Sequence, residues 1–141
     1  MLQLLLHLTG DYLLQSDQMS ARKRSSSAWA GFHAVIYALP FLLLQPSWSA
    51  WSMICGTHFL IDRFGLARYV VWAKNLVLGL WPMWLLNRGA VEEQSRRRLA
   101  WANCAATGYP ADVEPWLASM LLIVVDNTLH LLINYSSLAW L

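Results

Sequence analysis

Three pairs of histidine and aspartate with a spacing of four residues are the feature of this 141-residue sequence most suited to chemistry. Residues four apart lie one turn apart on the same face of a helix, so each pair can direct an imidazole and a carboxylate to one place. Histidine comes first in two pairs and aspartate in the third. The pairs are His7 with Asp11, His58 with Asp62, and Asp126 with His130.

Carboxylates and imidazoles that converge in a low-dielectric helical bundle need positive charge to offset them, so we expect a cation site. Helical His/Asp pairs are a recurrent way to build one. With the fourth histidine, the chain offers enough ligands for two divalent ions. The seven candidates are His7, Asp11, His33, His58, Asp62, Asp126 and His130.

The mixture of nitrogen and oxygen donors favours zinc, with manganese and magnesium as alternatives. Such ions make a bound water nucleophilic and polarise the attacked oxygen, which suits hydrolysis of an ester or phosphoester. We therefore predict that Asp11, Asp62 and Asp126 are catalytic. The side chains expected to orient the ligands or contact the substrate are Gln15, Asp17, Asn127 and Asn134.

Two other uses of these residues stay open. Intramembrane aspartate and histidine also form proton or ion pathways that need no bound metal. A His/Asp pair inside a bundle can also serve as a structural hydrogen bond, in which case the cluster only holds helices together.

The composition places these residues in a membrane protein. Hydrophobic residues make up 57% of the chain and charged residues only 13%. A net charge of +2 is too small to indicate binding to nucleic acid. Cys55 and Cys104 have no spacing typical of a metal site or a disulfide framework. An ionised aspartate in the bilayer costs about 2.5 kcal/mol or more, so the aspartates must face one another inside a bundle.

We predict an all-α fold, a single polytopic transmembrane helical bundle over residues 1–141. It has four crossings, one interfacial or re-entrant segment, and a cytoplasmic amphipathic helix in which Glu92 and Glu93 precede Arg96 and Arg97 by four residues. The crossings are about 1–18, 28–45, 51–68 and 113–135, the interfacial segment is about 69–86, and the cytoplasmic loop and helix are about 87–112.

Charge and residue order decide the placement of 69–86. If this segment crossed the bilayer, the arginines that follow it would be external, against the positive-inside rule. The reversed order of Asp126 and His130 predicts that the last helix runs antiparallel to the first. Both arguments favour an interfacial segment and place the N- and C-termini outside the cytoplasm.

The stretch HLTGDYLLQSD, together with the later stretches HFLID and DNTLH, resembles a family of small integral membrane proteins of bacteria and phages, the domain-of-unknown-function 3307 family. The family pattern is H-x-x-G-D-x-x-x-Q near the start, H-x-x-x-D in the middle and D-x-x-x-H near the end. All three are present here, and the last resembles the phage-borne branch. The resemblance implies a multi-pass protein of the bacterial inner membrane and implies no activity.

Two shorter likenesses point to a reaction. Thr57 to Asp62 is similar to membrane-bound metal-dependent hydrolases, and His7 to Gln15 is similar to a helix of zinc-dependent phospholipase C and nuclease enzymes. By analogy they favour a metal-dependent hydrolase of a lipid or lipid-linked ester or phosphate. The competing expectation is a non-enzymatic phage or bacterial factor that modifies the host envelope, with a structural metal or polar packing at the cluster. A homo-oligomer is compatible with either.

Overall fold

The computed structural model describes residues 1–86 and 89–141, and the side chains outside 79–93. Within this part of the chain every regular element is a helix and no strand occurs, which confirms the all-α prediction. The chain forms two compact units, Met1–Gly65 with Asn127–Leu141, and Leu66–Asp126. The first unit carries every predicted ligand except Asp126.

The first unit begins with a helix that changes its hydrogen-bond pattern midway. α1 (Leu2–Leu8) continues into a π-helical turn, η1 (Thr9–Leu13), which closes with a hydrogen bond of 3.0 Å from the Leu14 N–H to the Thr9 carbonyl. Such π turns are rare and occur frequently at functional sites. After a short break, the Ser16 hydroxyl caps α2 (Asp17–Arg22). The predicted crossing 1–18 therefore comprises α1, η1 and the start of α2.

Serine caps also start the next two helices. Ser26 caps α3 (Ser27–Ala38), which continues as the 3-10 helix η2 (Leu39–Leu44), and Ser47 caps α4 (Trp48–Phe64). α4 ends at Gly65, whose φ of 59° is a left-handed conformation that favours glycine. The predicted crossing 28–45 corresponds to α3 with η2, and 51–68 overlaps α4.

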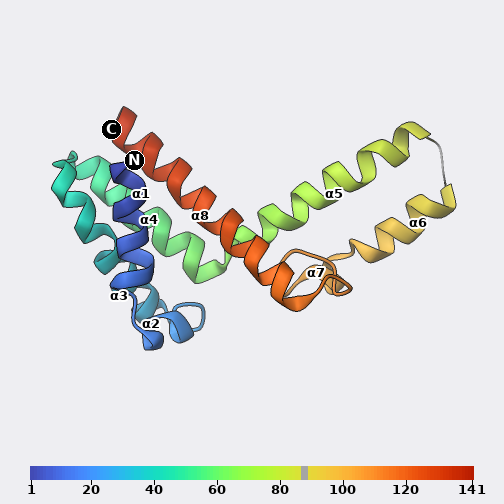
Figure 1. Cartoon of the computed structure of the whole chain (residues 1–141), viewed down its shortest axis with the longest axis horizontal. Helices are drawn as coiled ribbons and strands as arrows, with labels where there is room; N and C mark the ends of the chain where they lie inside the picture. The colour runs from blue at the N-terminus through green and yellow to red at the C-terminus, as the bar shows by residue number, and fades with distance from the viewer. Residues whose placement is uncertain (87–88) are drawn as a thin grey trace. The chain divides into compact units, whose positions relative to one another are not determined.

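The second half of α8 (Pro115–Trp140) packs in the first unit and runs antiparallel to α1, as the reversed Asp/His order predicts (Figure 1). Gln3 Nε2 donates to the Leu131 carbonyl at 2.7 Å. One turn later on α1, His7 Nε2 lies 3.0 Å from the Oδ1 of Asn127, which is one turn earlier on α8. The buried core of this unit is made by Leu6, Tyr37, Ala38, Phe41 and Ile54.

The second unit contains α5 (Leu66–Leu86), α6 (Gly89–Arg98), α7 (Trp101–Cys104) and the first half of α8. Trp72 Nε1 donates to the Leu99 carbonyl at 2.8 Å, which ties α5 to the end of α6. Where the sequence predicts one amphipathic helix in the segment 87–112, the structure has two short helices, α6 and α7. The side chains of Glu92 and Glu93, which were expected to pair with arginines, lie outside the described residues.

An exposed ion pair closes the loop before α8. Arg98 Nε donates to Asp112 Oδ2 at 2.8 Å, and this hydrogen bond holds the pKa of the Asp112 carboxyl below its usual range. The two cysteines, Cys55 and Cys104, are both free.

Two segments among the described residues are long and apolar enough to cross a membrane, Ser27–Leu44 and Pro115–Trp140. Little of Pro115–Trp140 is buried within the protein, as expected for a helix with a lipid-facing surface. These two segments favour membrane association.

Candidate metal centre

Gly10 brings the π turn into close contact with α3. A Cβ atom at this position would lie 2.7 Å from Tyr37 Cδ2 and 2.9 Å from the Tyr37 carbonyl oxygen, so the approach requires glycine. Gly10 therefore allows the π turn and α3 to pack closely. Asp11 is the next residue, and its carboxylate is thereby directed toward the imidazoles of α3 and α4.

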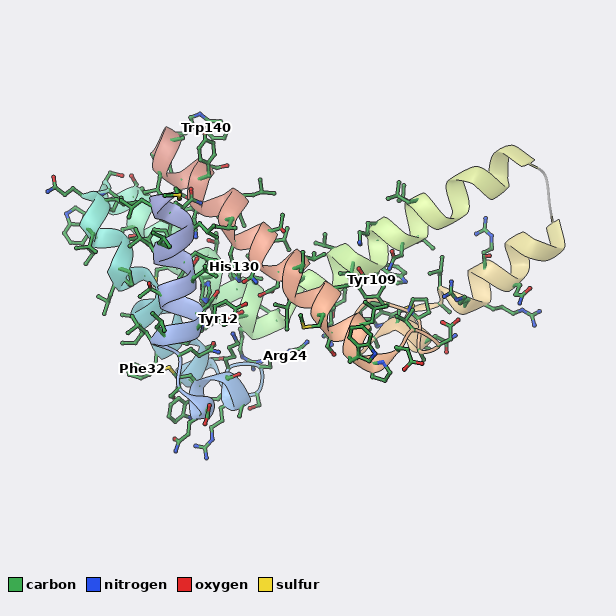
Figure 2. All side chains as sticks on the ribbon, viewed as in Figure 1. Tyr12, Arg24, Phe32, Tyr109, His130 and Trp140 are labelled. Atoms are coloured by element: carbon green, nitrogen blue, oxygen red, sulfur yellow. The ribbon has the colours of Figure 1, made fainter. Side chains whose placement is uncertain are left out.

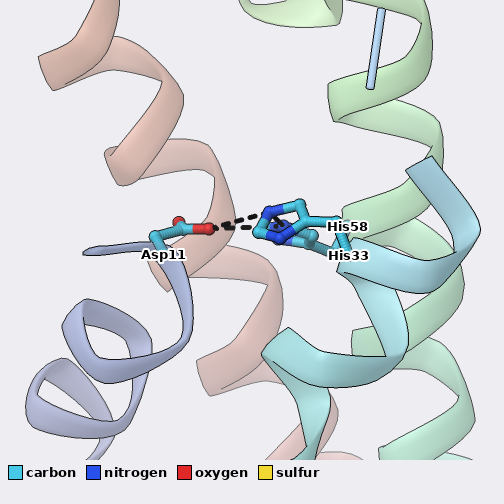
Figure 3. A group of neighbouring side chains, drawn as sticks. All are labelled: Asp11, His33 and His58. Atoms are coloured by element: carbon cyan, nitrogen blue, oxygen red, sulfur yellow. Dashed lines mark hydrogen bonds and ion pairs between the residues drawn. The ribbon is translucent and has the colours of Figure 1, made fainter. Parts of the chain in front are cut away.

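Three donor atoms from three elements meet inside the first unit. Asp11 Oδ1 lies 3.3 Å from His33 Nε2 and 3.4 Å from His58 Nε2, and the two nitrogens are 3.0 Å apart. Figure 3 shows the carboxylate facing the two imidazoles. The histidines are buried, whereas the side chain of Asp11 is 11% exposed.

These separations are close to those of ligands around a small metal ion. Zinc binds imidazole nitrogen and carboxylate oxygen at about 2.0–2.2 Å in tetrahedral geometry, which places neighbouring ligand atoms roughly 3.3–3.6 Å apart. Asp11 Oδ1 is also buried and accepts no hydrogen bond from the described residues. A cation bound between Asp11, His33 and His58 would satisfy this oxygen, and the three residues could hold one.

Asp62 contacts the same two imidazoles. Its Oδ2 lies 3.2 Å from His33 Nε2 and 3.1 Å from His58 Nε2. The same oxygen accepts a hydrogen bond of 2.9 Å from Lys23 Nζ, which also donates to Gln15 Oε1 at 2.9 Å. Asp62 is therefore shared between the histidine pair and a charged amine.

A second set of buried donors overlaps the first. Asp62 Oδ1 lies 3.8 Å from the Nε2 of His130, which reaches the interior of the unit from α8 (Figure 2). His58, Asp62 and His130 could together hold a metal ion. Because His58 belongs to both sets, the two candidate metal positions would be adjacent.

His7 is buried beside these donors, and both of its ring nitrogens make hydrogen bonds. Nδ1 lies 2.8 Å from the Tyr37 hydroxyl and Nε2 lies 3.0 Å from Asn127 Oδ1. Both bonds are satisfied when the hydroxyl donates to Nδ1 and the Nε2–H donates to Asn127. Nδ1 is also 3.5 Å from Asp11 Oδ2. This geometry places His7 behind Asp11, outside both sets of donor atoms.

Tyr37 orients the centre through its ring and its hydroxyl. The ring is stacked on His58, with centroids 3.6 Å apart and planes at 12°, and the hydroxyl accepts from Asn134 Nδ2 at 2.6 Å. The Nδ1 atoms of His33 and His58 are buried without a hydrogen-bond partner among the described residues. Among the described residues no group gives either imidazole the outer hydrogen bond that usually orients a metal ligand, and the stacked ring of Tyr37 packs against His58.

The other predicted residues divide into two groups. Gln15, Asn127 and Asn134 connect to the centre through Lys23, His7 and Tyr37, respectively. Asp17 is exposed in the first turn of α2, where a negative charge stabilises the helix. Asp126 is half-buried on α8 and belongs to neither donor set found among the described residues.

Two residues of the centre are absent from the sequence-based predictions. Tyr37 follows His33 by four residues, and this helical spacing was the signal that could have revealed it. Lys23 lies in a basic turn between two apolar segments, where basic residues usually indicate the cytoplasmic side of a membrane protein. Nothing in its local sequence connects it with Asp62.

The comparison with family models matched the part of the chain that contains most of these donors. A family model described as "Protein of unknown function (DUF3307)" matches residues 1–78, which include Asp11, His33, His58 and Asp62. The comparison with curated proteins found no match, and neither did the comparison with solved structures. Because the matched region covers more than half of the chain, the protein belongs to the DUF3307 family of proteins of unknown function.

Proposed function

We propose that this protein binds a divalent metal ion within a membrane and uses it to hydrolyse a lipid or lipid-linked ester or phosphate. The observation that supports the metal most strongly is the triangle of Asp11 Oδ1, His33 Nε2 and His58 Nε2, with sides of 3.0–3.4 Å. Two imidazoles and one carboxylate favour zinc, because manganese and magnesium prefer more oxygen ligands.

Asp11, His33 and His58 would hold the ion, and a metal with three protein ligands would be able to bind a water as well, as in catalytic zinc sites. A divalent ion there supplies two effects, a more acidic water and a polarised substrate oxygen. Asp62 contacts both imidazoles and would accept the proton of that water. The water oxygen would bond to the carbonyl carbon or phosphorus, the bond to the alcohol oxygen would break, and the alcohol would leave with the proton that Asp62 took from the water.

The surroundings of Asp11 support a lipid substrate. Tyr12 and Leu13, which follow Asp11 in the π turn, are 56% and 78% exposed, so apolar surface lies directly beside the partly exposed ligand. We further propose a location in the bacterial inner membrane with four crossings, both termini outside the cytoplasm, and 69–86 in the interface. The catalytic role predicted for Asp126 stays a prediction.

One observation favours a second candidate, a structural metal in a non-enzymatic membrane factor. Asp62 Oδ2 contacts the same imidazoles as Asp11, so it could occupy the fourth position itself. A metal whose four positions are all filled by protein is typical of structural zinc.

The variant Asp62→Asn separates the two candidates. If Asp62 is a general base, the variant keeps stoichiometric metal and loses hydrolysis by about 100-fold or more. If Asp62 is the fourth ligand, the variant loses metal. The measurements are the metal content of protein purified in neutral detergent and the release of fatty acid or phosphate from a panel of bacterial lipids.

Asp17→Asn is the matched control, because it neutralises an exposed carboxylate of the same unit and is expected to change neither quantity. His58→Ala combined with Asp62→Ala is expected to abolish metal binding in either case. A wild-type protein without stoichiometric metal, whose double variant keeps full stability, would overturn the metal centre. Metal-loaded protein that hydrolyses no lipid ester or phosphate would overturn the hydrolase.

A further inference from the structure

Lys23 is a charged group at the rim of the centre that the hydrolytic step above does not use. Its ammonium lies 2.9 Å from Asp62 Oδ2 and 2.9 Å from Gln15 Oε1. The lysine side chain is 19% exposed, against 4% for Asp62 and 0% for His33. Lys23 is therefore more accessible from outside than Asp62 and His33, the groups of the centre that it lies beside.

The net charge of the centre would change from negative to positive when a divalent ion is bound. Asp11 and Asp62 contribute two negative charges, and Lys23 offsets one of them. A divalent ion adds two positive charges, so the metal-loaded group carries a net positive charge. In a partly buried site such a charge attracts an anion. Lysine on its flexible stem is a common point-charge partner for phosphate oxygens.

We propose that the ligand of this centre carries a phosphate group, and that Lys23 binds it by turning its ammonium from Asp62 to a phosphate oxygen. The turn breaks one hydrogen bond of Asp62 Oδ2 and leaves that oxygen available to accept a proton. Gln15 keeps the ammonium at the rim. This inference rests on the proposed metal centre and narrows its substrate to phosphate-bearing molecules.

The test uses full-length protein in phosphate-free neutral detergent, loaded with cobalt(II), whose visible absorption reports changes in its ligands. Inorganic phosphate is titrated into the wild type and into Lys23→Met, which keeps the length of the side chain and removes its charge. We expect Lys23→Met to bind phosphate at least about tenfold more weakly, the loss of one charge-assisted hydrogen bond. Cobalt affinity is expected to stay the same or rise, because a cation beside Asp62 is removed.

Lys74→Met is the matched control, since Lys74 is the other lysine of the chain and belongs to the second unit. It is expected to behave as the wild type, and Lys23→Arg is expected to keep most of the phosphate affinity. Gln15→Leu keeps the lysine but removes its second anchor, so it gives an independent arm if Lys23→Met fails to fold. It is expected to weaken phosphate binding in the same direction.

Micelles doped with phosphatidic acid or with diacylglycerol identify the source of the phosphate. Binding of phosphatidic acid and not diacylglycerol supports a lipid phosphate, and binding of inorganic phosphate alone supports a soluble one. Phosphate affinity that is unchanged in the Lys23 and Gln15 variants overturns the inference and leaves the metal centre intact. Cobalt-loaded wild type that binds neither form of phosphate does the same. A wild type that takes up no cobalt overturns the centre and the inference together.

Discussion

At the scale of single residues, Asp11 presents its two oxygens to different neighbours. Oδ1 faces His33 and His58, and Oδ2 lies 3.5 Å from His7 Nδ1. His7 is in turn hydrogen-bonded to Tyr37 and Asn127. His7 therefore lies beside the Asp11 carboxylate but belongs to neither donor set, so identical His/Asp spacing in the sequence serves different roles at His7 and His58.

This difference predicts unequal effects of substitution at the two histidines. His7→Phe preserves the ring volume but removes the two hydrogen bonds of the imidazole, to the Tyr37 hydroxyl and to Asn127 Oδ1. We expect this to cost about 0.5–1.5 kcal/mol of unfolding free energy for each bond lost. Metal affinity should fall by about 10- to 100-fold, as is usual for an outer-shell change. His58→Phe should abolish metal binding.

Metal titration and denaturant unfolding in detergent check both variants. If His7→Phe removed the metal as completely as His58→Phe, His7 would be a ligand and not an outer residue.

At the scale of elements, the centre depends on the contact between the π turn η1 and α3. The turn inserts an extra residue at the point where the chain passes Tyr37, and Gly10 allows the two backbones to approach. Asp11 is carried by the same turn. The position of the carboxylate is therefore coupled to the packing of two helices and not to the geometry of a regular α-helix.

Gly10→Ala is expected to destabilise the protein by about 1–3 kcal/mol, the usual cost of overpacking. The added methyl would lie 2.9 Å from the Tyr37 carbonyl oxygen, and a backbone atom cannot move away as a flexible side chain can. Metal affinity should fall as well, because Asp11 moves with the turn.

Gly31→Ala in α3 and Gly56→Ala in α4 are matched controls, since a Cβ at either position meets nothing within 4 Å. In these helices alanine is expected to raise stability by roughly 0.5–1 kcal/mol. Thermal unfolding and metal titration of the three variants measure the effect. A Gly10→Ala protein as stable and as metal-competent as the controls would show that the close approach is dispensable.

At the scale of the whole molecule, the distribution of charge predicts the proposed topology of the chain in a membrane. Basic residues cluster in the turn before α3 and in the last turn of α6, where Arg96, Arg97 and Arg98 are consecutive. By the positive-inside rule both regions are expected in the cytoplasm, and with the proposed crossings this predicts that the segment 69–86 does not cross the bilayer.

A reporter fused after Leu86 is therefore expected to be cytoplasmic, fluorescent as a green fluorescent protein fusion and inactive as an alkaline phosphatase fusion. Fusions after Ser25 and after Pro46 calibrate the assay, with cytoplasmic and external results expected, respectively. A periplasmic result at Leu86 would make α5 a crossing and place the arginines of α6 outside.

The sequence alone was sufficient to predict the all-α class of the fold, the family, and the histidine and aspartate donors of the candidate centre. Helical spacing is a local property, so the His/Asp pairs at residues 7 and 11, and 58 and 62, could be placed on helix faces without a structure. The reversed order at residues 126 and 130 correctly indicated an antiparallel last helix, because direction follows from the order of matched groups along the chain.

Only the tertiary structure decided which of these donors meet. Contacts between residues far apart in the chain depend on how closely helices approach, and Gly10 sets that distance for Asp11. The same packing placed His7 behind the centre, stacked Tyr37 on His58, and brought Lys23 from a basic turn to Asp62. None of these follows from local spacing, because each depends on the relative position of two elements that the sequence describes separately.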